Sequence, residues 1–222
     1  MPLDIIGMFL LAYLIGSIPF GYIVVKIKSG KDIRTIQSGR TGMTNAMRAA
    51  GVGAGLLTVL LDITKGATAV AIARLHPSFQ QPWLLIIIPL LVIIGHNYSI
   101  FMLSKQVSGK LKIGGGAGGA ACLGGSLGLW WPSSIIVLII GILIYYFVGY
   151  ASVTTMSIAL SSTIIFALRA INIDPSSWAY AAYGFVAEIL LVISLRPNIQ
   201  RLKKGTERLH GFRARKNKSP NH

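Results

Sequence analysis

The residues whose types could perform chemistry together lie in one glycine-rich segment, residues 38–51, which reads SGRTGMTNAMRAAG. Glycines let backbone N–H groups approach an oxyanion closely, the hydroxyls of Ser38 and Thr44 can donate hydrogen bonds, and Arg40 and Arg48 carry charge that suits phosphate. The segment therefore predicts an anion-binding loop. An ordinary glycine-rich turn that carries two arginines explains the same composition, and residue types alone leave both interpretations open.

Asp62 and Lys65 form a second candidate, because they stand three residues apart within an apolar stretch. Residues at this spacing share one face of a helix. Ionised side chains inside an apolar helix are costly, so we expect the two to pair with each other or to face a polar cavity. A structural ion pair and a functional site both fit this pattern.

Two further polar segments follow along the chain. The first contains His96, Lys110, Lys112 and the run 114–119, GGGAGG, which includes Gly115 and Gly116. A glycine cradle that opens a helix can hold phosphate, but glycine-rich faces also serve close helix packing in membranes. The second segment, 196–207, adds Asn198 and Arg201. Four segments of this kind on one side of a protein suggest a phosphorylated ligand.

The elements that must position these residues are membrane helices. Of the 222 residues, 53% are hydrophobic and only 12% are charged, about half the charged share of a soluble domain. Long runs without charge approach the roughly 20 residues that cross a bilayer. They predict an all-α membrane protein, a bundle of seven transmembrane helices, at residues 4–26, 52–74, 83–104, 115–131, 133–150, 152–169 and 177–195. The prediction of the fourth helix is the least secure, because its many glycines also fit a loop followed by a short helix. A membrane protein tolerates such irregular backbone only where other parts of the protein cover it.

Charge predicts how the bundle is oriented. The net charge of +15 would suggest nucleic acid in a soluble protein, but cytoplasmic loops of membrane proteins collect Lys and Arg, so we expect no nucleic-acid partner. Basic residues concentrate in 26–51, in 105–113 and from Arg196 to Lys218, whereas the alternate connections are short and nearly free of them. The prediction is an N-terminus outside and a C-terminus in the cytoplasm. We expect one membrane domain, 1–205, and a basic cytoplasmic tail, 206–222, that is attracted to anionic lipid.

The polar segments together resemble one family over nearly the whole chain. The pattern S-G-x-x-G-x-T-N-x-x-R at 38–48, with G-S-I-P-F-G at 16–21 and D-x-x-K-G at 62–66, is similar to that of the bacterial acyl-phosphate-dependent glycerol-3-phosphate acyltransferases. The spacing also fits Gly95-His96, Tyr150-x-Ser152 and the segment 198–207. The resemblance implies a seven-helix bundle in the bacterial inner membrane, with its active site on the cytoplasmic side.

The resemblance also implies a reaction. These enzymes move a fatty acyl group from acyl phosphate to the 1-hydroxyl of glycerol 3-phosphate, and they use neither metal nor acyl-CoA. The implied site is assembled from all four segments, and we expect a monomer. The implied catalytic residues are Ser38, Arg48 and Asn198, and the implied substrate-binding residues are Gly39, Arg40, Gly42, Thr44, Asn45, Lys65, His96, Lys110, Lys112, Gly115, Gly116, Ser152 and Arg201.

Four positions depart from the family pattern. The first loop usually reads SGNPG, whereas Arg40 and Thr41 stand in its middle here. Ala117 replaces a phosphate-binding lysine, and Leu195 stands where a histidine is expected. Three hypotheses therefore remain: an acyltransferase with a rebuilt phosphate site, a diverged member that takes another phosphorylated substrate, or a small transporter built on the same bundle.

Overall fold

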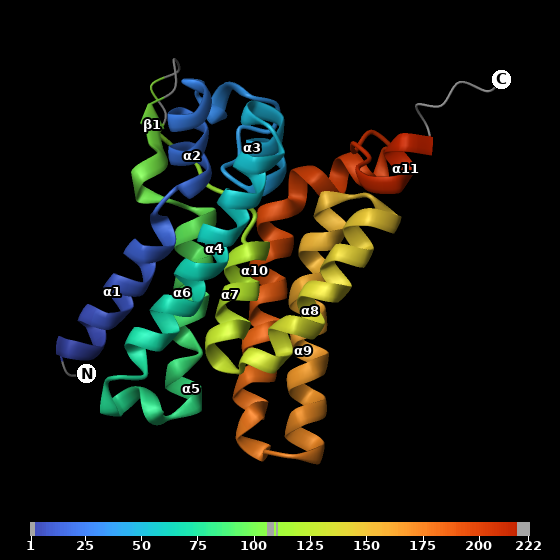
Figure 1. Ribbon diagram of the computed structural model, residues 1–222. Helices are drawn as coiled ribbons and strands as arrows, with labels where there is room; N and C mark the ends of the chain where they lie inside the picture. The colour runs from blue at the N-terminus through green and yellow to red at the C-terminus, as the bar shows by residue number, and fades with distance from the viewer. Residues whose placement is uncertain (1–2, 106–108, 110, 217–222) are drawn as a thin grey trace.

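The computed structural model describes residues 3–105, 109 and 111–216 and folds into an elongated bundle of helices (Figure 1). Within the described residues, six helical stretches are long and apolar enough to cross a membrane. Their main elements are α1 (Leu3–Ser17) with α2 (Phe20–Ser29), α4 (Val52–Ala73), α5 (Pro82–Leu85) with α6 (Ile87–Asn97), α8 (Trp131–Leu143), α9 (Ala151–Asn172) and α10 (Trp178–Lys203).

Shorter elements lie within, between and after these stretches. They are α3 (Met43–Ala50), α7 (Gly119–Leu129), α11 (Gly211–Lys216), the π-helical turn η4 (Ile144–Val148) and the 3₁₀ turns η1 (Ile33–Thr35), η2 (Pro77–Gln80), η3 (Ile100–Met102) and η5 (Pro175–Ser177). Strands β1 (Leu103–Lys105) and β2 (Leu111–Ile113) form an antiparallel hairpin, with Leu103 opposite Ile113. Among the described residues, the regular structure is thus helical apart from this hairpin and an isolated β-bridge between Tyr150 and Leu209, and the expectation of an all-α protein included neither.

The fourth expected helix differs most from its prediction. Residues 115–131 were expected to be helical, but α7 starts only at Gly119 and has 11 residues. At 1.5 Å per residue it is about 16 Å long, whereas the hydrocarbon core is about 30 Å thick. Residues 114–118 run as non-helical backbone instead, and Gly115, Gly116 and Gly118 are buried. Protein covers this irregular backbone, as a membrane interior requires.

Two other boundaries move. The last helix was expected to end at residue 195, but α10 continues to Lys203 with Pro197 inside it. Asn198 therefore sits on a helix, not in a loop. The stretch expected as a helix at 83–104 is interrupted at Ile86 and ends as a regular helix at Asn97, after which η3 and β1 begin.

Small residues allow the helices to approach closely. The packed pairs include α1 with α6, α4 with α7 and α9 with α10. At the crossing of α4 and α7, a Cβ added to Gly66 would lie 2.7 Å from the carbonyl oxygen of Ala121. Such packing is the usual basis of helix association in lipid. Fully buried Phe79, Phe166 and Tyr183 fill the interior.

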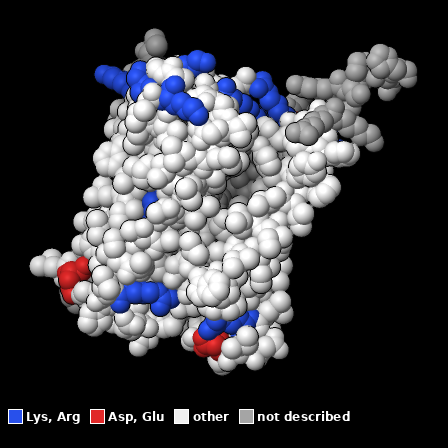
Figure 2. All heavy atoms as spheres, viewed as in Figure 1, with Lys and Arg blue, Asp and Glu red and all other residues white. Residues whose placement is uncertain are grey.

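Charged residues mark the two ends of the bundle. Most Lys and Arg side chains in view gather at the end where α2, α3 and β1 lie, and the middle of the surface is almost free of charge (Figure 2). The start of α1 lies at the opposite end from α11 (Figure 1). We call the lysine- and arginine-rich end, formed by the described residues 26–51, 103–105, 111–113 and 196–213, the basic end.

Candidate active site

One cavity of about 790 Å³ opens near the basic end. Figure 2 shows a hollow on the side of the bundle just below the blue side chains. Its walls come from the loop before α3, from helices α3, α4, α7, α8, α9 and α10, from His96 of α6, from η4, from residues 117–118, and from residues 206–208 and 210. Polar side chains line the part near the basic end, and apolar ones line the deeper part. The four polar segments singled out in the sequence all reach or flank this cavity.

The loop before α3 is held in place by Asn45. Its Nδ2 donates to the carbonyl oxygens of Ile33 at 3.2 Å, Ile36 at 2.9 Å and Arg40 at 2.9 Å. Gly39 takes a left-handed conformation with φ of 67°, which glycine adopts without strain. Three bonds from one buried amide fix the path of the loop, so Asn45 shapes the cavity wall while also lining it.

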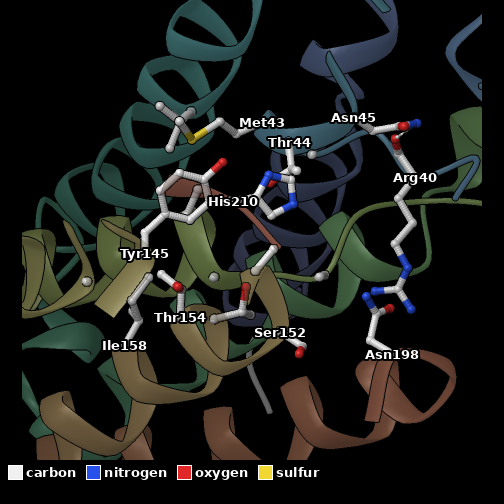
Figure 3. A pocket seen from close by; sticks show the side chains of 18 of the residues that line it. Arg40, Met43, Thr44, Asn45, Tyr145, Ser152, Thr154, Ile158, Asn198 and His210 are labelled. Atoms are coloured by element: carbon white, nitrogen blue, oxygen red, sulfur yellow. Dashed lines mark hydrogen bonds between the residues drawn. The ribbon is translucent and has the colours of Figure 1, made fainter. Parts of the chain in front are cut away.

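Arg40 spans the cavity from this loop to α10. Its Nη2 donates to the carbonyl oxygen of Ser194, and its side chain reaches toward Asn198 (Figure 3). Among the described residues, Nη1 has no hydrogen-bond partner although it is buried. Burial, assisted by the charge of Arg201, lowers the pKa of Arg40. A half-buried cation whose Nη1 is buried without a partner among the described residues is suited to an anionic ligand at the cavity wall.

Arg48 approaches the cavity from α3 and meets His210. The Arg48 Nη2 and His210 Nε2 atoms are 3.0 Å apart. The His210 ring stacks on Tyr145, with centroids 5.5 Å apart and planes at 20°. Burial and the positive charge of Arg208 lower the pKa of Arg48. Figure 3 places His210 beside Tyr145 and Thr44 at one wall.

Glu207 ties two candidate residues together. Its Oε2 accepts a hydrogen bond from Ser152 Oγ at 2.6 Å, and its Oε1 accepts from Asn198 Nδ2 at 3.2 Å. The carboxylate thus joins the start of α9 to α10. Asn198 Oδ1 is buried without a partner among the described residues, so it is the amide atom that a ligand in the cavity can use.

Asp62, Lys65 and His96 form a buried cluster beneath the polar part of the cavity. Lys65 Nζ lies 2.9 Å from Asp62 Oδ1 and donates to His96 Nδ1 at 2.9 Å and to the carbonyl oxygen of Ile18 at 3.0 Å. The expected pairing of Asp62 with Lys65 is confirmed. Both side chains are 2% exposed, and the lysine is committed to partners that link α4 to α6 and to the break between α1 and α2.

The glycines of 114–118 pack against the end of α6. A Cβ on Gly116 would lie 2.0 Å from His96 Nε2, and one on Gly115 would lie 2.3 Å from the Asn97 carbonyl oxygen. Gly116 N–H donates to the His96 carbonyl at 2.8 Å. Close backbone packing therefore accounts for Gly115 and Gly116, which do not line the cavity.

The deeper part of the cavity is apolar. Its walls come from one face each of α4, α7, α8 and α9. They are built by Leu56, Val59, Ile63, Leu123, Val137, Leu138, Ile142 and Ile158. Such a lining suits a hydrocarbon chain, because burying apolar surface yields roughly 0.8 kcal/mol per CH₂ group.

Ten of the sixteen residues proposed from the sequence line this cavity, and they come from four separate segments. They are Ser38, Arg40, Gly42, Thr44, Asn45, Arg48, His96, Ser152, Asn198 and Arg201. Gly39, Lys65, Gly115 and Gly116 stand behind the wall, and Lys112 is exposed on β2. Lys110 lies outside the described residues.

The sequence interpretation did not assign several polar residues of the wall to the site, among them Tyr145, Thr154, Glu207, Arg208 and His210. Glu207 belongs to the segment 198–207 that fits the family pattern, but it was not among the proposed site residues. His210 sits in the segment assigned to the tail, and no local pattern indicates that this segment returns to α8 and α9.

A model of the family described as glycerol-3-phosphate acyltransferase matches residues 6–205. The chain belongs to the glycerol-3-phosphate acyltransferase family. A relative of that name from Thermus thermophilus is 34% identical over 205 residues, covering 92% of this chain and 94% of the relative. Another, from Bartonella quintana, is 32% identical and covers 90% of this chain and 89% of the relative.

Two solved structures share the fold. The glycerol 3-phosphate form of PlsY (YgiH), an integral membrane glycerol 3-phosphate acyltransferase, superimposes with a TM-score of 0.76 at 28% identity, covering 94% of this chain and 96% of that one. Its lysophosphatidic acid form gives 0.73 at 27% identity with the same coverage. Two departures from the acyltransferase pattern, Ala117 and Leu195, both line the cavity of this chain.

Proposed function

We propose that this protein transfers a fatty acyl group from acyl phosphate to the 1-hydroxyl of glycerol 3-phosphate, giving lysophosphatidic acid. One observation carries the proposal: a single cavity joins an arginine-rich polar part to an apolar part of hydrocarbon-binding character. A donor with a phosphate at one end of a fatty chain requires both parts side by side. The family membership supports the acceptor and the product.

The polar part would hold two phosphorylated molecules. Arg40, Arg48 and Arg201 supply the positive charge, and Ser38 and Thr44 add hydroxyl donors. Fixed donors aimed at developing negative charge are the main way in which a protein accelerates acyl transfer. Holding both reactants at one place supplies the rest of the effect.

The proposed step is balanced without a cofactor. The 1-hydroxyl oxygen attacks the acyl carbonyl carbon, the bond from that carbon to the phosphate oxygen breaks, and phosphate leaves with the electron pair. The hydroxyl proton passes to the leaving phosphate. The phosphate is a suitable proton acceptor because three side chains that could otherwise act as the base already have partners. Asp62 pairs with Lys65, Glu207 accepts hydrogen bonds from Ser152 and Asn198, and His210 accepts one from Arg48.

The setting follows from the charge pattern. We propose that α7 completes a seven-helix bundle in the bacterial inner membrane, with the basic end and the C-terminus in the cytoplasm and the N-terminus outside. Basic residues at one end and short, weakly charged connections at the other support this orientation. We also propose that the protein acts as a monomer, since one chain supplies every wall of the cavity.

The test is acyl transfer by purified protein in a lipid mesophase, with palmitoyl phosphate and radiolabelled glycerol 3-phosphate. We expect labelled lysophosphatidic acid, and a loss of at least about 100-fold in Arg48→Ala if this guanidinium stabilises transition-state charge. Lys31→Ala removes a cation that is exposed and outside the cavity, so it should retain the activity. Absence of transfer by folded protein would refute the proposal.

A second candidate function is acyl transfer to another phosphorylated acceptor. It is favoured by Ala117 and Leu195, which put two apolar side chains on the wall where the family pattern has a lysine and a histidine. The same assay with other polyol phosphates separates the two. Faster transfer to one of these than to glycerol 3-phosphate would establish the diverged specificity.

A further inference from the structure

Residues 206–216 form a strap that returns to the cavity after the last membrane helix. Leu209 pairs with Tyr150 in a β-bridge, and His210 N–H donates to the Gly149 carbonyl oxygen at 2.8 Å. Arg213 Nη1 donates to the Val148 carbonyl oxygen at 3.3 Å, and α11 packs on η4. These contacts dock the strap on the junction between α8 and α9, beside which α11 lies in Figure 1. Residues 206–208 and His210 of the strap line the cavity.

Docking brings His210 to Arg48 across 162 positions of sequence, at 3.0 Å. A guanidinium has only donors, so Nε2 must accept this hydrogen bond and the imidazole must be neutral, with its proton on Nδ1. The stacked Tyr145 ring fixes the plane of the imidazole from the other side. The geometry therefore fixes both the tautomer and the direction in which His210 holds Arg48.

We propose that His210 is a positioning residue, carried by the strap, that holds the Arg48 guanidinium in place to bind a substrate phosphate. This inference rests on the proposed function, because it assigns Arg48 to a phosphorylated substrate. His210 lies beyond residue 205, where the match to the family model ends. It does not contact the reacting atoms itself but acts through Arg48.

The charges around His210 predict how the contact depends on pH. The facing groups are Arg48 from α3, Tyr145 from η4, and Glu207 and Arg208 from the strap. Burial and the positive charge of Arg48 lower the pKa of His210 from its usual value near 6.5. Above that value His210 is neutral in both the docked and the released strap. As the pH falls below it, the released strap binds a proton first, so the docked arrangement loses stability.

The test compares His210→Ala, His210→Gln and the wild type in the acyl-transfer assay. A glutamine oxygen can accept from Arg48 but does not titrate. We expect His210→Ala to raise the KM for the phosphorylated substrate about tenfold, the size expected for a lost hydrogen bond to a charged group, with a smaller change in kcat. His210→Gln should recover most of that loss at pH 7.5. It should show a smaller decline in activity than the wild type as the pH falls below about 6.5, because only the ionisation of the substrate phosphates remains.

The matched control is His76→Gln, which changes a histidine that pairs with Asp4 at 2.8 Å, far from the cavity. It should leave both the KM and the pH profile unchanged. An unchanged KM in His210→Ala, or an acid decline in His210→Gln equal to that of the wild type, would overturn the proposal.

A readout without activity separates this inference from the proposed function. Phenylglyoxal modifies arginines, and mass spectrometry can follow Arg48 with the exposed Arg34 as internal reference. We expect Arg48 to react several times faster in His210→Ala than in the wild type or His210→Gln. Equal rates of Arg48 modification in all three proteins would exclude the positioning role, even if the enzyme transfers acyl groups. Faster modification in His210→Ala, combined with a wild type that transfers no acyl groups, would support the positioning role and refute only the proposed reaction.

Discussion

At the scale of single residues, Arg40 shows how the wall of the cavity is arranged for an anion. Its position in the first loop is held by the Asn45 amide, and its guanidinium reaches α10. The buried Nη1 lacks a partner among the described residues. An unpaired buried donor costs free energy of folding, on the order of 1–3 kcal/mol. Because the unpaired Nη1 lowers the stability of the free protein, we expect it to donate a hydrogen bond to the ligand when one is bound.

This argument predicts that Arg40→Met separates stability from activity. The free energy of unfolding should stay the same or rise, because the buried charge disappears while the aliphatic bulk remains. The KM for the phosphorylated substrates should rise about tenfold or more. Thermal unfolding in detergent and acyl-transfer kinetics measure the two quantities.

Arg34→Met is the matched control for Arg40. Arg34 lies in the same loop, but it is exposed and pairs with Asp32 at 2.6 Å. Its replacement should leave the KM unchanged. A fall in the melting temperature of Arg40→Met without a change in KM would assign Arg40 to structure alone.

At the scale of elements, the non-helical segment 114–118 is the feature that brings α6 and α7 together around the cavity. Gly116 lies against the His96 ring, and Gly118 has φ of 87° just before α7 begins. Because His96 in turn contacts Lys65, the segment also supports the ion pair between Asp62 and Lys65. The conformation of this segment therefore helps to hold the cluster of Asp62, Lys65 and His96 in place beneath the polar part of the cavity.

Gly116→Ala should consequently destabilise the protein. Its Cβ would lie 2.0 Å from His96 Nε2, and forcing an atom into a packed interior costs about 1–3 kcal/mol. Gly7→Ala is the control, because its Cβ meets nothing within 4 Å and alanine favours a helix. Thermal unfolding should therefore show a lower midpoint for Gly116→Ala and an equal or higher one for Gly7→Ala. Equal midpoints for the two variants would contradict the packing role.

Local patterns predicted the long elements well and the short ones poorly. Apolar runs located the six long helical stretches because burial in lipid depends on composition over about 20 residues. The end of α10 was misplaced because Pro197 and the polar residues around it indicate a helix end, whereas the helix continues to Lys203. The hairpin β1–β2 depends on pairing between two three-residue strands, too short to give a pattern.

The candidate site was predictable only where its residues belong to local sequence motifs. Arg48 and Asn198 were recognised from motif spacing, and both line the cavity. His210 was not, because its place depends on backbone contacts with Gly149 and Tyr150 that only the folded chain forms. The glycines at 115 and 116 fitted both a phosphate cradle and close packing, and only the distance to His96 and Asn97 separates the two.

At the scale of the whole molecule, the cavity opens toward the same end of the bundle at which positive charge is concentrated. The cavity opens near the basic end, where water-soluble phosphorylated molecules would enter, and its apolar part is lined by the helices whose outer surface is almost free of charge. Positive charge at the mouth raises the local concentration of anionic substrates. The same charge favours retention of this end in the cytoplasm. In the proposed orientation, substrate entry and the retention of this end in the cytoplasm depend on the same residues.

Cysteine labelling tests this orientation directly. Cys122 is buried, so Cys122→Ala provides a background into which Lys31→Cys and Leu75→Cys can be placed, one at each end of the bundle. Leu75 is 85% exposed between α4 and η2, and Lys31 is exposed beyond α2. We expect a membrane-impermeant maleimide to label Leu75→Cys in bacterial spheroplasts. Lys31→Cys should be labelled only after the membrane is permeabilised. The reverse pattern would place the basic end and its cavity outside, where intracellular acyl phosphate and glycerol 3-phosphate could not reach it, and the proposed reaction would fail with it.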